Sequence, residues 1–272
     1  MSMTTVSAVQ RHARPSPQFA AKVTHSIALL RLAQSRGEPG ELVQASSLGA
    51  EDIVVTHLLH LAGLPLNVFV LDTGHLHAET LGLLDKLEAR YGKAPEVFQP
   101  DTEAVVQFVA QHGPWAMRQS VALRHNCCHL RKVEPLQRAL AGRAGWITGL
   151  RREQSSQRQQ LQELDLEPVP LDPMQSRLKV SPLLDWTWGD VWHFIALHGL
   201  DYNPLHDQFF PSIGCAPCTR AISLGEDFRA GRWWWEHDAE GSAGGVKECG
   251  LHMALPTASP QAPLQASAPA ST

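Results

Sequence analysis

Short apolar segments of strand length alternate along this chain with longer segments of helical periodicity. The pattern predicts strands at 42–45, 66–71, 96–99 and 146–150, and helices at 19–34, 53–62, 75–91, 101–112, 130–141 and 186–198. Strands that alternate with helices predict an α/β fold on a doubly wound, mainly parallel sheet. Such sheets bind ligands at the carboxyl ends of their strands, so the turns after the strands are the candidate sites.

Composition excludes several classes of protein. The chain has 272 residues, of which 43% are hydrophobic, and this is enough to bury a substantial core. The formal net charge is −4 without a long basic run, which argues against nucleic acid or a membrane surface as the partner. No apolar stretch approaches the roughly 20 residues that a membrane helix needs.

Changes in composition along the chain predict four parts. We expect a flexible N-terminus at 1–18 and an α/β domain at 19–232. A mobile segment at 233–253 follows, because the run 241–245 is rich in glycine. Residues 254–272 are almost only Ala, Pro, Ser, Gln, Thr and Leu, which predicts a disordered tail.

Three predicted strand ends carry residues that suit an anionic nucleotide. The segment 46–52 joins a strand to a helix through small residues, and a helix N-terminus offers unpaired N–H groups to an anion. Taken alone, a plain helix start with a serine cap is the simpler interpretation. The segment 71–74 ends the next strand, where an adenosine can lie, although an ordinary βα turn explains it equally well. The segment 149–158 carries three arginines, which is typical of an oxyanion clamp or of a solvated charged loop.

Four cysteines have the spacing of metal ligands. Cys127 and Cys128 are adjacent, and Cys215 and Cys218 form a C-x-x-C motif. Thiolates bind iron–sulfur clusters in sets of four, and zinc in similar sets, so both metals stay open. Adjacent cysteines point in different directions on a regular backbone, so two ligands from such a pair require unusual local geometry. Five cysteines are too few for a disulfide scaffold and predict a reducing compartment, the cytoplasm.

The fifth cysteine stands apart from the other four. Cys249 follows the glycine-rich run and is flanked by Lys247 and His252, whose positive charge favours the thiolate. A thiolate on a mobile segment is typical of a nucleophile that closes over a site. The alternative is a surface cysteine without a role.

Five motifs along the chain resemble the sulfonucleotide reductases. They are 46–52, 71–80, the cysteine pairs, 149–158, and 247–252, so the resemblance covers about 42–252. The four paired cysteines resemble the iron–sulfur branch of that family, the assimilatory adenylyl-sulfate (APS) reductases. The chain departs from the pattern at Leu48, where many relatives have an aromatic residue, and 233–246 is longer than usual.

The resemblance implies both a fold and an activity. The fold is that of the adenine-nucleotide alpha-hydrolases, and the activity is reduction of APS to sulfite and AMP. The Cys249 thiolate attacks the sulfur of APS and forms an S-sulfocysteine, which thioredoxin or a glutaredoxin-like donor then reduces. One 4Fe-4S cluster is expected on Cys127, Cys128, Cys215 and Cys218. The family often forms homo-oligomers, but no motif identifies an interface.

The resemblance also places the substrate residues. The phosphosulfate is expected near the first turn, the adenosine near the second, and the basic groups around both. The predicted substrate-binding residues are Ser46, Ser47, Gly49, Glu51, Leu71, Asp72, Thr73, Lys132, Gly149, Arg152, Arg158, Arg229, Arg232 and His252. Among them, Lys132 is expected between the cluster and the substrate.

Three other functions remain to be weighed. A phosphoadenylyl-sulfate (PAPS) reductase resembles this chain but typically lacks the four cluster cysteines. An ATP pyrophosphatase of RNA thiolation resembles a strand–SGGxDS–helix, which the segment 46–52 does not match. A zinc-stabilised nucleotide-binding module is the alternative without enzymatic activity.

Overall fold

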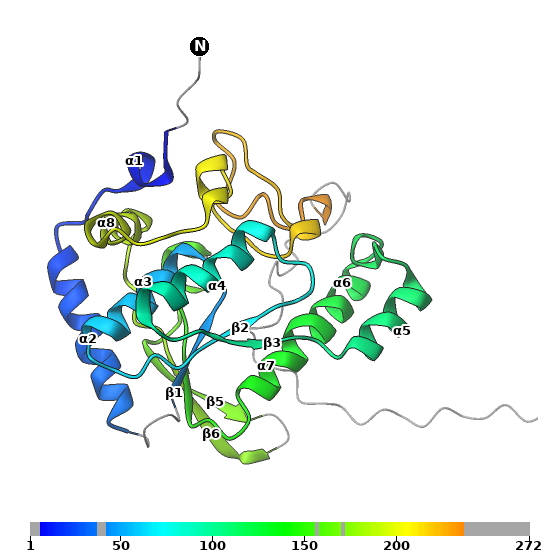
Figure 1. Ribbon diagram of the computed structural model, residues 1–272, viewed down its shortest axis with the longest axis horizontal. Helices are drawn as coiled ribbons and strands as arrows, with labels where there is room; N and C mark the ends of the chain where they lie inside the picture. The colour runs from blue at the N-terminus through cyan, green and yellow to red at the C-terminus, as the bar shows by residue number, and fades with distance from the viewer. Residues whose placement is uncertain (1–5, 37–41, 156–157, 170–171, 237–272) are drawn as a thin grey trace, which may run out of the picture.

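Six strands form one sheet at the centre of the protein (Figure 1). The computed structural model describes residues 6–36, 42–155, 158–169 and 172–236. The sheet order is β3-β2-β1-β4-β6-β5, and every pair is parallel except β5 with β6. The strands are β1 (Leu42–Ser46), β2 (Val68–Leu71), β3 (Glu96–Phe98), β4 (Gly145–Ile147), β5 (Leu164–Val169) and β6 (Asp172–Val180). The predicted doubly wound, mainly parallel sheet is confirmed.

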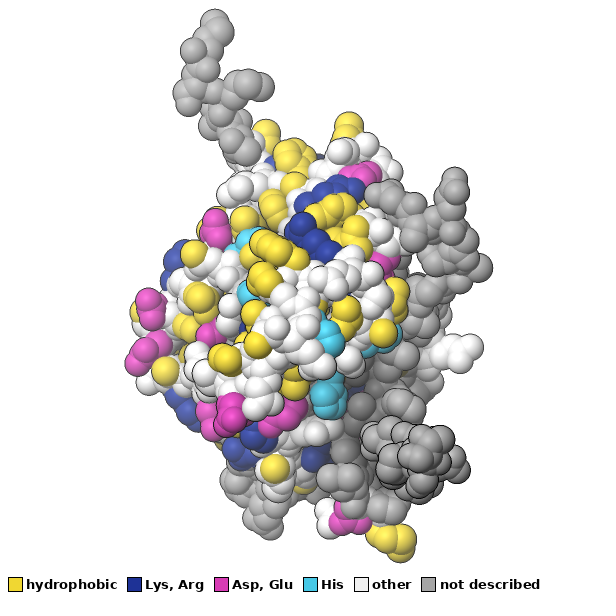
Figure 2. All heavy atoms as spheres, turned by 90° about the vertical axis from the view of Figure 1, so that its right-hand side faces the viewer, with side chains coloured by type: hydrophobic (Ala, Val, Ile, Leu, Met, Phe, Trp, Pro, Cys, Tyr) yellow, Lys and Arg dark blue, Asp and Glu magenta, His cyan; other side chains and the backbone are white. Residues whose placement is uncertain are grey.

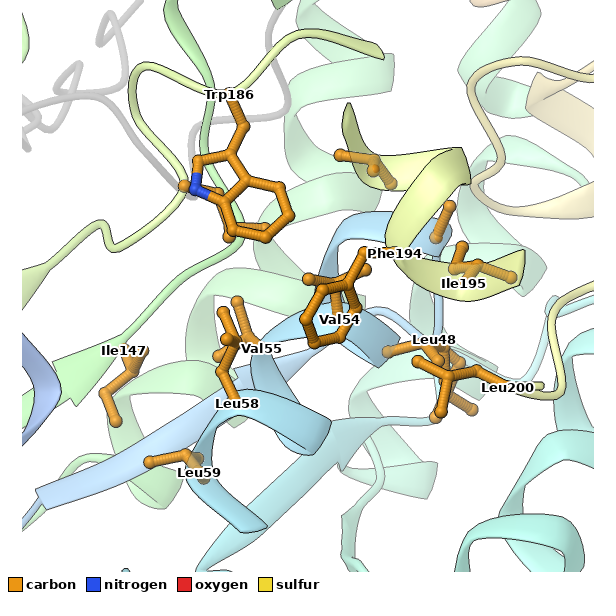
Figure 3. Close-up of a cluster of buried hydrophobic side chains, with 14 of the residues drawn as sticks. Leu48, Val54, Val55, Leu58, Leu59, Ile147, Trp186, Phe194, Ile195 and Leu200 are labelled. Atoms are coloured by element: carbon orange, nitrogen blue, oxygen red, sulfur yellow. The ribbon is translucent and has the colours of Figure 1, made fainter. Parts of the chain in front are cut away.

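Helices cover both faces of the sheet. The larger core cluster joins one face to α2 (Phe19–Gln34), α3 (Ala50–Leu61), α4 (Ala78–Tyr91) and α8 (Trp188–His198), and Figure 3 shows part of it. The smaller cluster packs α7 (Glu134–Ala139) on the opposite face. Leu42 belongs to the first cluster and Val43 to the second, because successive side chains of a strand point to opposite faces.

Local signals fix several helix ends. Asp101 accepts a hydrogen bond from the N–H of Ala104 and caps α5 (Thr102–His112). Gly92 ends α4 in the left-handed conformation, with φ at 70°. Thr187 begins α8 with a reciprocal capping box to Asp190.

The structure differs from the predicted elements in two places. The helix predicted at 130–141 is the end of a longer one, in which α6 (Val121–Cys128) continues through a π-helical turn, His129–Val133, into α7. The hairpin of β5 and β6 was not predicted, because its strands carry polar residues that find partners only in the fold. Lys179, for example, is buried beside Glu167.

The N-terminal prediction needs a correction. Residues 1–18 were expected to be flexible, but within the described part Ser7 caps the helix α1 (Ala8–His12). The Ala8 N–H donates to the Asp207 carboxylate at 2.6 Å, and Arg11 donates to the carbonyl of His206. This segment therefore packs on α8 and its following loop. The rest of the predicted domain division stays a prediction, and the segment 237–272 lies outside the described residues.

Membrane insertion finds no support among the helices that the structure describes. None of them is both long enough and apolar enough to cross a bilayer.

Candidate active site

A cavity of about 220 Å³ opens at the carboxyl edge of the sheet, where β1 lies between β2 and β4. The order of strands reverses there, which is the usual ligand site of doubly wound sheets. The loops after β1, β2 and β4 all reach it. The predicted residues that line it are Ser46, Ser47, Gly49, Glu51, Leu71, Thr73, Lys132, Gly149, Arg158, Arg229 and Arg232.

The loop after β1 is held by one buried side chain. Leu48 has a φ of 59° and is fully buried in the core that Figure 3 shows. Its N–H donates to the Ser46 hydroxyl at 3.1 Å, and Gly49 is the N-cap residue of α3. The small polar residues of this turn therefore face the cavity, while the buried Leu48 side chain holds the turn against the core.

Two acidic side chains in the first turn of α3 do not point at the cavity as free charges. The Asp52 carboxylate accepts hydrogen bonds from the Ser47 N–H and hydroxyl, both at 2.6 Å, and from the Gly149 N–H at 3.1 Å. Burial raises the pKa of Asp52 to about 6, although these hydrogen bonds lower it. Glu51 accepts from Arg151 through Nε and Nη2, at 3.1 and 3.0 Å.

The arginines of the loop after β4 have separate roles. Arg151 is 1% exposed and pairs with Glu51, and its guanidinium lies 5.3 Å from the Trp188 ring. Arg152 binds Asp185 and the carbonyl of Leu161, so it does not line the cavity. Arg158 lines the cavity, and its Nη1 donates to Gln154.

Asp72 is another predicted residue that does not line the cavity, and two predicted residues cannot be placed. Asp72 accepts hydrogen bonds from the Gly74 N–H and from Gln99, and it is absent from the cavity wall. His252 falls outside the described residues, as does the predicted nucleophile Cys249.

Several cavity residues were missed from the sequence. Asp52, Gln154 and His206 line the cavity, as does Trp233. His206 donates from Nδ1 to the carbonyl of Phe210 at 2.7 Å, and burial lowers its pKa to about 4, so the ring is neutral. The presence of two acids in a predicted anion site was a signal that basic or N–H partners had to be near.

The four paired cysteines come from two segments that the fold brings together. Cys127 and Cys128 end α6, immediately before the π-helical turn, and Cys215 and Cys218 flank a 3-10 turn. All four are buried free thiols. Cys127, Cys215 and Cys218 share one cluster with Met117 and Trp233, while Cys128 is buried at the same helix end.

Neighbouring positive groups and burial change the pKa values of these thiols. Burial would raise the pKa of Cys215, but Lys132, the Thr73 hydroxyl at 3.3 Å and Arg232 together lower it. Burial and the neighbouring Cys215 raise the pKa of Cys218 to about 11. In the described part of the chain, no three His, Cys, Asp or Glu side chains stand in a ready metal-binding arrangement. The donor set of four buried sulfurs suits a thiolate-bound metal centre, iron–sulfur or zinc.

One wall is common to the cavity and the cysteine group. Lys132, Arg232 and Trp233 line the cavity and also act on or pack against the cysteines. The Arg232 guanidinium lies 4.7 Å from the Trp233 ring, in the space left by Gly214, where a Cβ would come 2.3 Å from Nη2. Lys132 and Arg232 therefore act electrostatically on Cys215 from the cavity wall, while Trp233 packs against the cysteines.

The outer surface beside the cysteines is basic and aromatic. Arg118 lies within 5.3 Å of the rings of Trp115, Trp234 and Trp235, and it donates to the carbonyl of Pro217. Figure 2 views the side that carries α5 and α6, and in the upper part of this face Lys and Arg side chains lie beside hydrophobic ones. Trp115 is more than half exposed there.

Comparisons with known proteins identify relatives over most of the chain. Residues 41–221 match the model of the phosphoadenosine phosphosulfate reductase domain. An adenosine 5'-phosphosulfate reductase of Burkholderia cepacia is 48% identical over 90% of this chain and 93% of its own. One from Allochromatium vinosum is 47% identical over 81% of this chain and 82% of its own.

Solved structures share the fold. A phosphoadenylyl-sulfate reductase from Candida auris in a phosphate complex superposes with a TM-score of 0.59 at 24% identity, covering 75% of this chain and 97% of that one. An FMN adenylyltransferase from Candida glabrata reaches 0.53 at 14% identity, over 85% and 78%. These two likenesses concern the fold alone, whereas the domain match and the sequence identities establish that the chain belongs to the phosphoadenosine phosphosulfate reductase family.

Proposed function

We propose that this protein reduces adenylyl sulfate to sulfite and AMP, in sulfate assimilation. The observation that carries the proposal is the cationic cavity, in which Lys132, Arg158, Arg229 and Arg232 meet the loops after β1 and β4. A thiolate and a sulfate repel each other, so cations around them are needed for attack at sulfur. The relatives named for adenosine 5'-phosphosulfate support this substrate.

The reaction has two steps. The Cys249 thiolate forms a bond to the sulfur of APS, the S–O bond to AMP breaks, and AMP leaves with the electron pair. One thiolate of thioredoxin, or of a glutaredoxin-like donor, then attacks the Cys249 sulfur and releases sulfite. The second donor thiol resolves the mixed disulfide, so Cys249 returns as a thiolate and the donor leaves oxidised. Two electrons pass from the dithiol to sulfur.

The chain's own residues prepare this attack. Lys132 and Arg232 place positive charge between the cavity and the cysteines, and Arg158 and Arg229 add charge on the other walls. These fixed cations stabilise the negative charge that develops on the leaving phosphate. His206 stays neutral, because burial holds its pKa at about 4.

We further propose that Cys127, Cys128, Cys215 and Cys218 hold one 4Fe-4S cluster. The donor set of four buried thiols supports it. When bound, such a cluster supplies a fixed local charge beside Lys132 rather than a path for electrons, because the donor dithiol already closes the cycle. Free buried thiols also support a reducing compartment, the cytoplasm.

Mass spectrometry tests the proposed intermediate. Protein mixed with APS and no donor should gain about 80 Da, the mass of SO₃, on the peptide that contains Cys249. Cys249→Ser protein should remain unmodified under the same conditions. Consumption of APS while the Cys249 peptide stays unmodified would exclude this mechanism.

Substrate choice is tested separately. Values of kcat/KM for APS and for PAPS, measured with the same donor, should favour APS strongly. Equal values would make the enzyme a reductase of both nucleotides. A colourless protein with bound zinc and no turnover of either nucleotide would support the nucleotide-binding module instead.

A further inference from the structure

One buried carboxylate joins the two loops that face the anion site. The loop after β1 contributes the Ser47 N–H and hydroxyl, and the loop after β4 contributes the Gly149 N–H. All three donate to Asp52, which is 9% exposed. The two strands are neighbours in the sheet, but in the described structure this carboxylate links the loops beyond them.

The backbone that carries the Asp52 carboxylate is held in place by buried hydrogen bonds. The carbonyl of Asp52 accepts from Gln44 Nε2 at 2.8 Å and from the Thr56 hydroxyl at 2.9 Å, and both of these partners are buried. Gln44 belongs to β1, so the first turn of α3 is fixed to the centre of the sheet. A side chain held in this way can define the separation of the two loops.

Close approach on the second loop depends on a glycine. A Cβ at position 149 would lie 2.4 Å from Asp52 Oδ1 and 2.9 Å from the Cβ of Glu51. Atoms essentially never come so close, so any larger residue pushes the loop away from the carboxylate. Glycine at this position therefore serves the contact with Asp52.

The neighbouring acid, Glu51, is linked by hydrogen bonds through Gln154 to the cavity residue Arg158. Glu51 accepts from Gln154 Nε2 at 2.9 Å, and Gln154 Oε1 accepts from Arg158. Arg158 lines the cavity. The first turn of α3 therefore sets both the backbone of the second loop and the position of one cavity guanidinium.

We propose that Asp52 is a positioning residue, whose ionised carboxylate holds the loops after β1 and β4 together so that the basic side chains of the cavity meet the sulfate and phosphate of the substrate. This inference rests on the proposed function. While Asp52 is ionised, the N–H groups of Ser47 and Gly149 are occupied by it. The anion is then held by Lys132, Arg158, Arg229 and Arg232 rather than by these two N–H groups.

Binding of APS tests the proposal directly. In a Cys249→Ser background, which prevents turnover, calorimetry at pH 7.5 should give a Kd for APS at least tenfold higher when Asp52→Asn is added. The amide cannot accept all three hydrogen bonds and brings its own N–H groups against the donors. In the protein with Cys249, the same change should raise KM for APS more than it lowers kcat.

Asp190→Asn is the matched control. Asp190 is also buried and accepts several hydrogen bonds, from Ser16, Lys22 and Thr187, but it does not line the cavity. Its loss should lower stability and leave the Kd for APS unchanged. An equal loss of affinity in both variants would mean that Asp52 acts only through general stability.

The pH dependence of binding provides a readout that does not require a variant. Glu51 is the charged neighbour that acts on Asp52, and the other charged or titratable groups lining the cavity in the described structure are Lys132, Arg158, Arg229, Arg232 and His206. His206 stays neutral above about pH 4. Because the pKa of Asp52 is about 6, affinity for APS should fall as the pH drops from 7.5 to 5. A histidine that gained charge over the same range would instead tighten binding of an anion.

Three results distinguish the outcomes. Asp52→Asn protein that binds APS as tightly as its parent, or more tightly, overturns the proposal, because Asp52 would then merely repel the anion. If this variant fails to fold, Gly149→Ala keeps the carboxylate and should weaken binding in the same way, and wild-type affinity in it also overturns the proposal. Failure of the Cys249→Ser parent itself to bind APS would instead refute the proposed function.

Discussion

The Arg124 guanidinium binds the Glu236 carboxylate through both Nε and Nη2, at 2.5 and 3.2 Å. Arg124 is 1% exposed and also lies 4.7 Å from the Trp233 ring. The pair joins α6, which ends in the cysteine pair, to the last turn that the structure describes, Trp234–Glu236. Because Arg124 is buried, this contact holds that turn against the cysteine group.

Removal of the Glu236 carboxylate should lower the stability of the protein. Glu236→Ala leaves a buried guanidinium without its carboxylate, and loss of one partner of a buried pair typically costs about 3 kcal/mol. Urea unfolding measures the change in free energy. The control is Glu134→Ala, whose ion pair with Arg138 is exposed and should contribute less than about 1 kcal/mol. Equal small effects in the two variants would show that the Glu236 pair is not a stabilising contact.

The ionisation of Asp190 should make the free energy of unfolding depend on pH in the acid range. Burial would raise its pKa, but Lys22, Ser16 and Thr187 lower it to about 2, from 3.8. A group with a lowered pKa in the folded state stabilises the fold above its unfolded pKa and loses this contribution as pH falls through the folded one. The Asp190→Asn variant should therefore be about 2 kcal/mol less stable than wild type at pH 7. The difference should shrink between pH 4 and pH 2, and a constant difference would contradict this account.

Serine variants should distinguish the proposed cluster cysteines from the proposed nucleophile, Cys249. Cys218→Ser removes one of four buried sulfurs and should abolish bound iron and the brown absorption near about 400 nm that iron–sulfur proteins show. Cys249→Ser should keep both and lose sulfite production. Iron and sulfide analysis of protein purified without oxygen measures the first effect. Wild-type protein that contains zinc and no iron would contradict the cluster assignment.

Lys132 should matter for the reaction more than for the fold. It lines the cavity and lowers the pKa of Cys215, so Lys132→Gln removes a cation from the cavity wall that also acts on this cysteine. Loss of such a group typically costs about 100-fold in rate, which kcat/KM for APS measures. Lys86→Gln, which removes an exposed pair with Asp201, should leave kcat/KM unchanged. Similar kcat/KM values in the two variants would remove Lys132 from the site.

Local patterns predicted those parts of the fold that local interactions stabilise. The alternation of apolar runs gave the strands β1 to β4, and the helix predicted at 101–112 begins at Asp101, whose side chain reaches an N–H three residues ahead. The hairpin of β5 and β6 escaped prediction, because Lys179 and Arg177 become buried only through distant partners. These are Glu167 and the carbonyls of Leu140 and Arg143.

In the arginine loop 149–158, the sequence does not determine which arginine becomes buried. Arg151 and Arg152 are adjacent, and Arg151 has an extended backbone, which sends neighbouring side chains to opposite sides. One therefore meets Glu51 and the other meets Asp185. The composition of the loop predicts a basic site, but only the position of α3 decides which guanidinium is buried.

By itself the sequence determined the sheet class, the three strand-end turns and the two cysteine motifs, because each depends on residue types at short spacing. Tertiary structure decided that Asp52 and Glu51 receive hydrogen bonds from the loops after β1 and β4. It also decided that Lys132, Arg232 and Trp233 line the cavity, where Lys132 and Arg232 act on the Cys215 thiol and Trp233 packs against the cysteines. These contacts join residues far apart in the chain, and their energies depend on burial, which no local pattern of residues specifies.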